Sequence, residues 1–348
     1  MVFLLVVIAL CAVAAGVLVP KVIDHRFPAF GKEGTIRIYE STDFDSFMQQ
    51  VSEKLEPRHP ASLMRAMRSE GAQKHIFPGQ YHFDTKNSAI YAARAVTRGW
   101  QNPVNVTITC PLRSVHLLAQ RMSSQLMVSE ELLEHAFRND ALLSKYGMSS
   151  VHLFEYIIPD TYQMYWTSTP EEIIKRLKKE YDAFWTDERR EAAARIGLTP
   201  SQVSVLASIV AEESSKADEY PKIASVYLTR LRKGIKLQAC PTVCYIYDYK
   251  IRRVLSNHLK NPSIYNTYMY EGLPPTPISL PGKEHIDAVL HPDKTPYLYF
   301  CADPALNGRN IFSVTYKEHL AHADEYHKAM DELALRKEAE QKADRDNE

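Results

Sequence analysis

Alternating and helical patterns of hydrophobic positions follow one another in the first third of this 348-residue chain. Alternation of apolar and polar side chains, typical of half-buried strands, occurs in three short stretches, at residues 34–40, 79–84 and 104–109. Helical periodicity predicts helices between and beside them, at residues 43–55, 60–69 and 88–98. This order of short elements predicts a small α+β module.

The rest of the chain predicts a larger and more helical unit. Helical patterns continue through residues 114–148, where Ser129 precedes two glutamates as an N-cap would. Further helices are expected at residues 170–194, after Thr199-Pro200, and at 220–233 before Gly234. Dense Pro and Gly predict an irregular, turn-rich surface at 241–282. A hairpin at 297–302 and 310–314 and a charged helical tail from residue 316 complete the prediction.

The helix after Pro200 places a carboxylate on its apolar side. Leu206, Ile209, Val210 and Glu213 follow the i, i+3, i+4, i+7 rule for one helical face, whereas Glu212 falls about 100° away from Glu213. Burial disfavours the ionised form of a carboxyl group, so its pKa rises and it can hold a proton near neutral pH. Glu213 is therefore a candidate acid catalyst, although most glutamates in amphipathic helices are solvated.

An uncharged, almost wholly apolar run occupies residues 2–19, about the length at which a helix spans a bilayer. A cleaved signal peptide is the alternative, because Ala12-Val-Ala14 resembles a cleavage site. No basic residue precedes the run and it is long for a signal peptide, so we expect an uncleaved anchor. The basic residues that follow, Lys21 and Arg26, would by themselves place the body of the protein in the cytoplasm.

Composition excludes several classes of function. Lys plus Arg and Asp plus Glu each number 42, so there is no basic surplus to indicate a nucleic-acid partner. The 45% hydrophobic content and the length predict about two folded domains. Beyond Cys11 in the apolar run, the cysteines are too few for a disulfide framework and lack zinc-like spacing; they are Cys110, Cys240, Cys244 and Cys301. The group His319, His322 and His327 is expected to lie on a solvated helix face.

Ordered motifs over about 150 residues resemble a known family, the membrane-anchored endolytic murein transglycosylases of the YceG-like type. The motifs are Pro159–Tyr162, Leu206–Val210 with Glu213, Ala224–Leu231, Leu237-Gln238 with Pro241–Val243, Tyr265–Tyr268, Gly272–Pro275, Pro277-Ile278, Pro281-Gly282, His291-Pro292 and Tyr297–Phe300. The family usually has an acidic residue at the position of Ala211 and often has Asn and Asp at those of Thr229 and Cys240. The alignment places the family's catalytic glutamate on Glu213.

The resemblance implies an α+β fold with an N-terminal transmembrane helix, a small LysM-like α+β module and a larger α+β catalytic domain. The implied boundaries are an anchor at residues 1–20, the LysM-like subdomain at 21–112, a helical connector at 113–154, the catalytic domain at 155–335 and a charged tail at 336–348. The expected location is the cytoplasmic membrane, with the catalytic domain on the extracytoplasmic side. This expectation overrides the charge asymmetry at the anchor.

The resemblance also implies a reaction. Glu213 would protonate the glycosidic oxygen between N-acetylmuramic acid and N-acetylglucosamine, and its carboxylate would then take the proton of the muramic acid 6-hydroxyl as a 1,6-anhydro ring closes. Substrate-binding candidates lie in the motifs around it: Arg230, Gln238, Thr242, Tyr265, Asn266 and Thr267. Arg230 could equally form a structural ion pair, and the Tyr265 loop a packing corner.

The partners implied are peptidoglycan glycan strands, the cytoplasmic membrane and peptidoglycan synthases, with no cofactor and no metal. Two other functions stay open at this stage. One is a non-catalytic glycan-binding or scaffold protein of the cell envelope. The other is a water-using muramidase with Asp160 or Glu212 as its second carboxylate.

Overall fold

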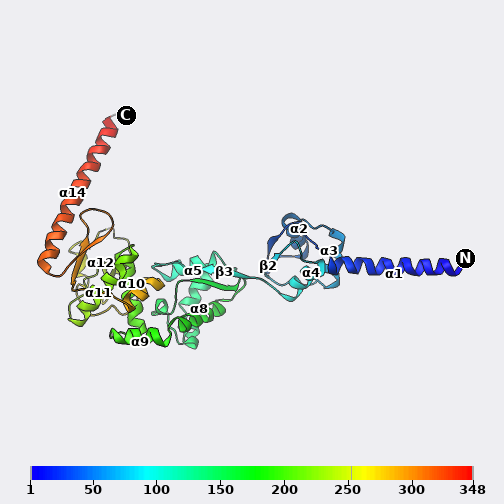
Figure 1. Ribbon diagram of the computed structural model, residues 1–348, viewed down its shortest axis with the longest axis horizontal. Coiled ribbons are helices and arrows are strands. Elements are labelled where there is room, and N and C mark those ends of the chain that lie inside the picture. The colour runs from blue at the N-terminus through cyan, green and yellow to red at the C-terminus, as the bar shows by residue number, and fades with distance from the viewer. Residues whose placement is uncertain (1, 252, 347–348) are drawn as a thin grey trace. The chain divides into compact units, whose positions relative to one another are not determined.

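A computed structural model describes residues 2–251 and 253–346, and the side chains of most of residues 2–14, of 338, 339 and of 342–346 are not described. The chain forms two compact units that interleave along the sequence. The first contains residues 1–106, 122–132 and 161–173, and the second contains residues 107–121, 133–160 and 174–348. The architecture is α+β, as predicted, with fourteen α-helices and three two-stranded sheets in the described part (Figure 1). The predicted domain boundaries stay predictions.

The first unit contains a strand-helix-helix-strand-helix module. Its elements are β1 (Gly34–Ile38), α2 (Phe44–Leu55), α3 (Pro60–Ser69), β2 (Gly79–Phe83) and α4 (Ala89–Arg98). The strands are antiparallel, with Gly34 opposite Phe83 and Ile38 opposite Gly79. Alternate side chains of both strands, including Ile36 and Tyr81, are buried in one core with the apolar faces of the helices. The predicted elements of this module are thus confirmed.

Local sequence signals set the helix ends of this module. Asp43 accepts a hydrogen bond from the Ser46 backbone N–H at 2.8 Å and caps α2, and Ser88 caps α4 in the same way. Gly99 ends α4 in the left-handed conformation, at φ 68°, which glycine adopts without the steric cost of a side chain.

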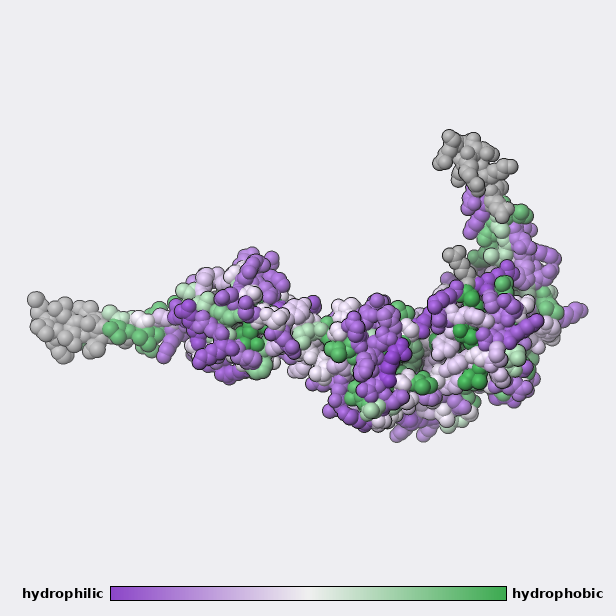
Figure 2. Space-filling model, turned by 180° about the vertical axis from the view of Figure 1, so that it is seen from behind, coloured by the Kyte–Doolittle hydropathy of each residue, from purple (hydrophilic) through white to green (hydrophobic). Residues whose placement is uncertain are grey.

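The N-terminal helix α1 (Val2–Arg26) is continuous, and its last turn packs on the module. Asp24 is buried there and accepts hydrogen bonds from Ser62 and from Arg65, the latter at 2.8 Å. Val17, Leu18 and Val19 are each more than half exposed, at 53%, 59% and 53%, and Figure 2 shows this apolar surface. Among the described residues, no helix meets the length and apolarity needed to cross a membrane. The anchor predicted at residues 2–19 lies largely outside the described side chains.

A second small sheet was only half predicted. Strand β3 (Pro103–Thr107) pairs with β4 (Thr161–Tyr165), which the sequence pattern did not predict as a strand. Tyr162 and Met164 of β4 are buried and the residues between and beside them are exposed, so the strand does alternate. The sequence pattern did not predict this strand because proline and aspartate, which are typical of turns, come just before it.

The second unit is built mainly of helices. They are α5 (Val115–Ser123), α6 (Glu130–Phe137), α7 (Asp140–Leu143), α8 (Pro170–Phe184), α9 (Asp187–Arg195), α10 (Pro200–Glu213), α11 (Tyr220–Arg232), α12 (Cys240–Ile246), α13 (Lys283–Leu290) and α14 (Tyr316–Asp346), with parts of α5, α6 and α8 in the first unit. Single turns of 3-10 helix lie at Ser144–Tyr146, Leu153–Glu155, Ala217–Glu219 and His258–Lys260. Strands β5 (Tyr299–Ala302) and β6 (Asn310–Ser313) form the predicted hairpin, and α14 packs on it.

Two helix predictions need correction. The single helix expected at 170–194 is two helices, α8 and α9, because the Thr186 side chain accepts a hydrogen bond from the Arg189 backbone N–H and starts a new helix. The segment 241–282, predicted to be irregular, opens with α12, for which Pro241 occupies the first turn.

Helix α10 is the central element of this unit. Thr199 and Gln202 form a reciprocal capping box at its start. Every residue from Val203 to Val210 is buried, so the helix has no solvated face over that stretch. It packs against α11, α12 and α13, and Glu213 is its last residue.

Candidate active site

Glu213 opens onto a cavity of about 710 Å³ within the second unit, which we call the Glu213 cavity. Helices α10, α11, α12 and α14 and the β5–β6 hairpin supply its walls. The polar or aromatic residues that line it are Glu213, Tyr227, Arg230, Gln238, Cys240, Tyr268, Tyr299, Phe300, Cys301, Asn310, Tyr316 and His319. Glu213 is the one carboxylic acid among its described lining residues.

The surroundings of Glu213 favour the protonated carboxyl group. Burial is the main cause that raises its pKa, from 4.5 to about 7, and the negative charge of Glu212 adds to it. Its place at the C-terminal end of α10 acts in the same direction, because the helix dipole is negative there. The hydroxyl of Tyr227 donates a hydrogen bond to Glu213 Oε1, which lowers the pKa, as does the charge of Arg230 to a smaller extent. The group is therefore poised near neutral pH.

Glu212 has a different environment, although it is the adjacent residue. The Arg113 guanidinium binds its carboxylate through Nε and Nη2, with the shortest contact at 2.7 Å, and only 4% of the Glu212 side chain is exposed. Arg113 also lies over the ring of Tyr249, 4.3 Å from its centroid. Glu212 does not line the Glu213 cavity. The prediction that one glutamate of the pair faces inward is thus incomplete, because Glu212 is also withdrawn from solvent.

Arg230 and Gln238 are the predicted binding residues that line the Glu213 cavity. Arg230 is buried and donates to the backbone carbonyls of Leu298, Lys236 and Leu237 at 2.7, 3.1 and 2.8 Å. Its Nη1 also lies 3.3 Å from Gln238 Oε1. Gln238 is exposed and has the left-handed backbone conformation, at φ 52°, which is uncommon for a residue with a side chain.

Three predicted binding residues have buried side chains that bond to the protein itself. Thr242 and Thr267 bond to each other at 2.9 Å, and Thr267 also accepts from the Ala239 backbone N–H at 3.0 Å. Asn266 donates to the carbonyls of Leu259 and Asn261. These three side chains hold the loop that carries Tyr265 and Tyr268 against the start of α12, and they do not line the Glu213 cavity. Tyr265 lines a second cavity instead.

Sequence reasoning missed several residues of the Glu213 cavity. Tyr227 and Arg230 are three apart on α11 and so share a helical face, a signal that was present in the sequence. Tyr268 and Tyr299 come from distant segments, and no sequence signal connects them to Glu213. His319, predicted to be solvated, lines the cavity and stacks on Tyr299 with ring centroids 5.4 Å apart. Burial lowers the His319 pKa, so its ring is neutral at pH 7.

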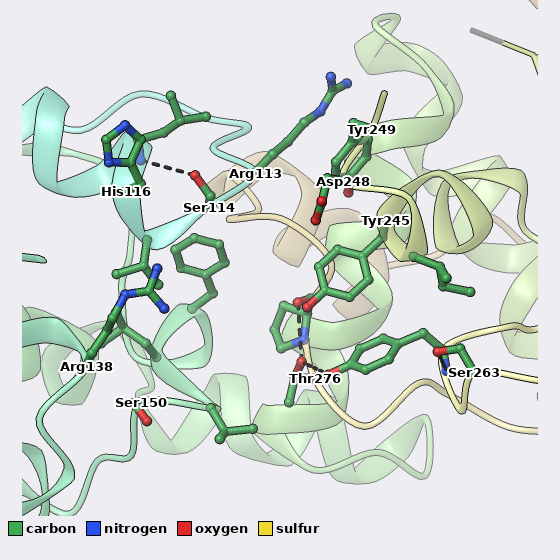
Figure 3. Close-up of a pocket in the computed structure, with 18 of the residues that line it drawn as sticks. Arg113, Ser114, His116, Arg138, Ser150, Tyr245, Asp248, Tyr249, Ser263 and Thr276 are labelled. Carbon is green, nitrogen blue, oxygen red and sulfur yellow. Dashed lines mark hydrogen bonds between the residues drawn. The ribbon is translucent and has the colours of Figure 1, made fainter. Parts of the chain in front are cut away.

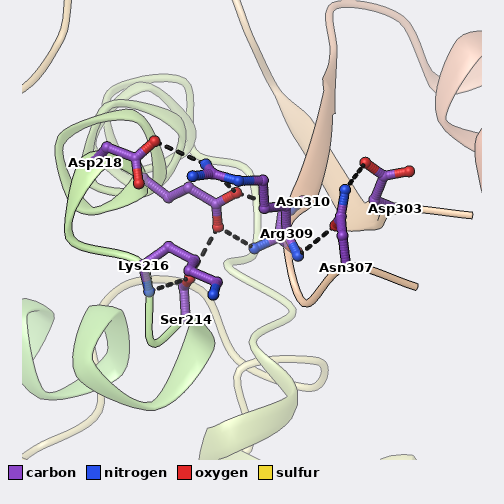
Figure 4. A network of polar contacts seen from close by, with 8 residues as sticks. Ser214, Lys216, Asp218, Asp303, Asn307, Arg309 and Asn310 are labelled. Atoms are coloured by element: carbon purple, nitrogen blue, oxygen red, sulfur yellow. Dashed lines mark hydrogen bonds and ion pairs between the residues drawn. The ribbon is translucent and has the colours of Figure 1, made fainter. Parts of the chain in front are cut away.

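A polar network centred on Glu219 fixes the chain just after Glu213 (Figure 4). Glu219 is buried and accepts from the Ser214 hydroxyl at 2.8 Å and from the backbone and side-chain nitrogens of Asn310, each at 2.9 Å. Ser214 follows Glu213 directly, and Asn310 lines the cavity at the start of β6. The network therefore connects the C-terminal end of α10, which carries Glu213, to the β5–β6 hairpin.

Two groups of potential metal ligands occur in the described part of the chain, and neither includes Glu213. They are Cys110 with Glu284 and His285, and His116 with Glu130 and Glu134. The Cys110 thiol donates to Glu284 at 3.6 Å, and burial raises its pKa to about 11, which disfavours the thiolate that metals require.

Comparison with known proteins identifies the family of this chain. A family model described as the YceG-like family matches residues 36–325. The chain belongs to this family. Among solved structures, a putative YceG-like protein from Listeria monocytogenes shares the fold, with a TM-score of 0.57 and 22% identity; the match covers 83% of this chain and 98% of that one.

Two curated relatives of this YceG-like chain bear the name endolytic murein transglycosylase. The Bacillus subtilis protein is 37% identical over 172 residues, which is 49% of this chain and 47% of that protein. The protein of Streptococcus pneumoniae serotype 2 is 22% identical over 206 residues, or 57% of this chain and 37% of that one. The chain thus matches less than half the length of these relatives.

Proposed function

We propose that this protein is an endolytic lytic transglycosylase that cleaves peptidoglycan glycan strands, with Glu213 as both acid and base. The observation that supports this most is the environment of Glu213, a single carboxyl group in a cavity with a pKa of about 7 and a tyrosine hydroxyl bound to it. A general acid works best with a pKa near the pH at which it acts. Family membership and the names of the relatives point to the same reaction.

In the proposed reaction, the Glu213 proton passes to the β-1,4 glycosidic oxygen as its bond to the anomeric carbon of N-acetylmuramic acid breaks. The 6-hydroxyl of the same sugar then bonds to the anomeric carbon, and the Glu213 carboxylate takes the hydroxyl proton. The products are a 1,6-anhydro-muramic acid end and a free N-acetylglucosamine 4-hydroxyl, and Glu213 is again protonated. No water is consumed.

The surroundings of the other acidic residues support a lyase over a water-using muramidase. Most glycoside hydrolases need two carboxyl groups on either side of the scissile bond. Glu212 is held by Arg113, and Asp160 forms an ion pair with Lys283; neither lines the Glu213 cavity. An intramolecular hydroxyl nucleophile needs no second carboxylate, so one acid suffices.

Among the predicted binding residues, we propose direct contact with the glycan for Gln238 and Arg230. Gln238 is exposed at the edge of the cavity, and Arg230 presents its charge beside the ring of Tyr299, 5.0 Å from the centroid. Thr242, Asn266 and Thr267 act through the loop that they hold in place. Tyr265 binds substrate in the neighbouring cavity.

Replacement of Glu213 tests the central assignment. A Glu213→Gln protein should lose cleavage of glycan strands by at least about 1,000-fold, because the amide cannot donate the proton. Mass analysis of digested strands distinguishes the candidates: anhydro ends are one water molecule lighter than the hydrolysed ends of a muramidase, and a scaffold protein yields neither. Anhydro products from Glu213→Gln at the wild-type rate would refute the proposal.

We further propose the cellular setting. The exposed apolar residues of α1 favour a membrane anchor at residues 2–19, with the catalytic unit on the extracytoplasmic side, where peptidoglycan lies. The strand-helix-helix-strand order of β1, α2, α3 and β2 supports a LysM-like, glycan-binding role for the small module. An anchored enzyme would meet newly made strands, so termination of strand elongation beside a peptidoglycan synthase is the role we propose.

A further inference from the structure

A second cavity, of about 990 Å³, lies in the same compact unit as Glu213, and we call it the tyrosine cavity (Figure 3). It shares no lining residue with the Glu213 cavity, but the same two segments reach both. Helix α12 carries Cys240 at the Glu213 cavity and Tyr245 at the tyrosine cavity, a rise of about 8 Å along the helix. The loop after it likewise carries Tyr268 at the first and Tyr265 at the second. The same two segments of the chain thus line both cavities.

One side of the tyrosine cavity is a fixed aromatic surface. The rings of Tyr245 and Tyr265 lie 4.7 Å apart, and those of Tyr245 and Tyr249 lie 6.3 Å apart. Tyr265 bonds through its hydroxyl to Thr276 at 2.7 Å, and Tyr249 donates to the carbonyl of Ile278 at 2.8 Å. Because these two hydroxyls are bound to the protein, the rings are held in place as a contact surface for a sugar or a peptide.

The cavity also has cationic side chains. Figure 3 shows Arg138 across the cavity from Tyr245 and Tyr249, whereas Arg113 lies over the ring of Tyr249 and Lys250 follows that tyrosine in the chain. Asp248, which pairs with Lys250, is the one carboxylic acid among the described lining residues. Three cationic side chains thus line the cavity against one carboxylate, and each of the three pairs with a carboxylate.

The two arginines are oriented by carboxylates that do not line the cavity. Arg138 binds Glu134 through Nε at 3.0 Å and Nη2 at 2.8 Å, and Arg113 binds Glu212 through the same two atoms. These bonds fix each guanidinium plane and do not engage its Nη1 edge. A preoriented guanidinium group is well suited to bind a carboxylate.

We infer that the tyrosine cavity is a subsite for the acidic peptide that peptidoglycan carries on its muramic acid residues. Its arginines bind peptide carboxylates, and its tyrosines contact the adjoining peptide or sugar. The inference rests on the proposed function, because it places one substrate across both cavities. It predicts that the enzyme selects strands that still carry charged peptides, a choice that the Glu213 cavity by itself does not explain.

Two substrates that differ only in charge test the subsite. They are uncross-linked glycan strands with native peptides and the same strands with their carboxylates converted to amides. We expect wild-type kcat/KM to be about tenfold higher for the native strands. In Arg138→Gln, and further in the double variant with Lys250→Gln, this ratio should fall towards one.

Arg138 suits the test because its loss does not disturb the core. Its side chain is 58% exposed and its pair with Glu134 is a surface i, i+4 contact. Arg113 is unsuitable, since its loss would leave the buried Glu212 carboxylate unpaired. Arg195→Gln is the control: Arg195 pairs with Glu191 at the same i, i+4 spacing, at 4.0 Å, lines neither cavity and should leave the ratio unchanged.

Equal kcat/KM for the two substrates in the wild-type protein would overturn the subsite and leave the proposed function intact. The same conclusion would follow if the ratio of kcat/KM for native to amidated strands were equal in Arg138→Gln and Arg195→Gln. Binding of a soluble muramyl tripeptide to Glu213→Gln protein, measured by calorimetry, gives a readout that needs no cleavage. If wild-type protein made no anhydro ends from either substrate, but this binding was lost on amidation of the ligand and in Arg138→Gln, the proposed function would fail and the subsite would stand.

Discussion

Glu213 and Glu212 are adjacent in the chain, yet their carboxylates have different environments. Glu212 has a guanidinium partner, which satisfies its charge and holds a loop from residue 113 against α10. For Glu213, burial and the negative end of the helix favour the neutral form, and the hydrogen bond from the Tyr227 phenol offsets this only in part. Both side chains are withdrawn from solvent, so the charge of the partner separates them: Glu212 has a guanidinium group beside it, and Glu213 has a neutral phenol.

The pH dependence of cleavage should follow Glu213. Because the acid must be protonated to act and its pKa is about 7, wild-type kcat/KM should fall about tenfold per pH unit above about pH 7. The Tyr227 hydroxyl stabilises the ionised carboxylate, so its loss raises the pKa of Glu213. In Tyr227→Phe the alkaline limb should therefore move to higher pH, by about one unit.

A pH series of initial rates checks this shift. Tyr156→Phe is the control, since Tyr156 packs on Tyr181, 5.2 Å between centroids, and lines neither cavity. An alkaline limb at the same pH in Tyr227→Phe and wild type would show that Tyr227 does not set the Glu213 pKa, even if the rate fell at every pH.

At the scale of elements, the site depends on where helices end. Helix α10 begins at a capping box and delivers Glu213 at its last turn, α11 brings Tyr227 and Arg230 on one face, and α12 begins at Cys240 beside them. The Glu219 network then joins the end of α10 to the β5–β6 hairpin. The position of Glu213 thus depends on contacts between elements that are about 100 residues apart in sequence.

Replacement of Glu219 should weaken the connection between the end of α10 and the β5–β6 hairpin. In Glu219→Ala, the Ser214 hydroxyl and both Asn310 nitrogens lose their acceptor, which should lower the free energy of unfolding by about 1 to 3 kcal/mol and lower kcat. Glu219→Gln keeps an acceptor oxygen and should recover part of both. Urea denaturation and initial rates measure the two effects.

The matched control for Glu219 is Asp218→Ala. Asp218 is adjacent and pairs with Arg309 at 2.7 Å, but both side chains are about half exposed, at 60% and 46%. We expect little change in stability or rate for this variant. Equal effects of the two substitutions would contradict a specific role for the buried carboxylate.

For the whole molecule, we propose different roles for the two compact units. The first has its own core under the β1–β2 sheet, and both cavities lie in the second. Helix α1 joins the first unit through its last turn, where Asp24 binds Ser62 and Arg65. Its exposed apolar residues precede this junction, so the anchor that we propose would continue into the folded module within one helix.

Deletion of residues 2–19 should move the protein from the membrane fraction to the soluble fraction of cells. The melting temperature should change little, because the deletion spares Asp24 and its partners. Asp24→Ala in the full chain should do the reverse, lowering the melting temperature while the protein stays in the membrane fraction. Retention of the deleted form in the membrane fraction would show that residues 2–19 are not the anchor.

The sequence by itself determined most of the elements, the α+β class, the family and the choice of Glu213. These follow from local chemistry: periodicity, caps such as Thr199 and Asp43, and motifs whose order along the chain is readable. It did not separate α8 from α9 or reveal β4, since those depend on a single cap and on pairing with a distant strand.

Only the tertiary structure decided which side chains share a cavity. It placed Tyr227, Tyr299 and His319 around Glu213, and it buried Thr242, Asn266 and Thr267 in the loop that they hold. Contacts of this kind join residues far apart in the chain, and their geometry is set by how helices and hairpins pack together. A one-dimensional pattern specifies the face of an element, but the partner of that face is specified only by the packed fold.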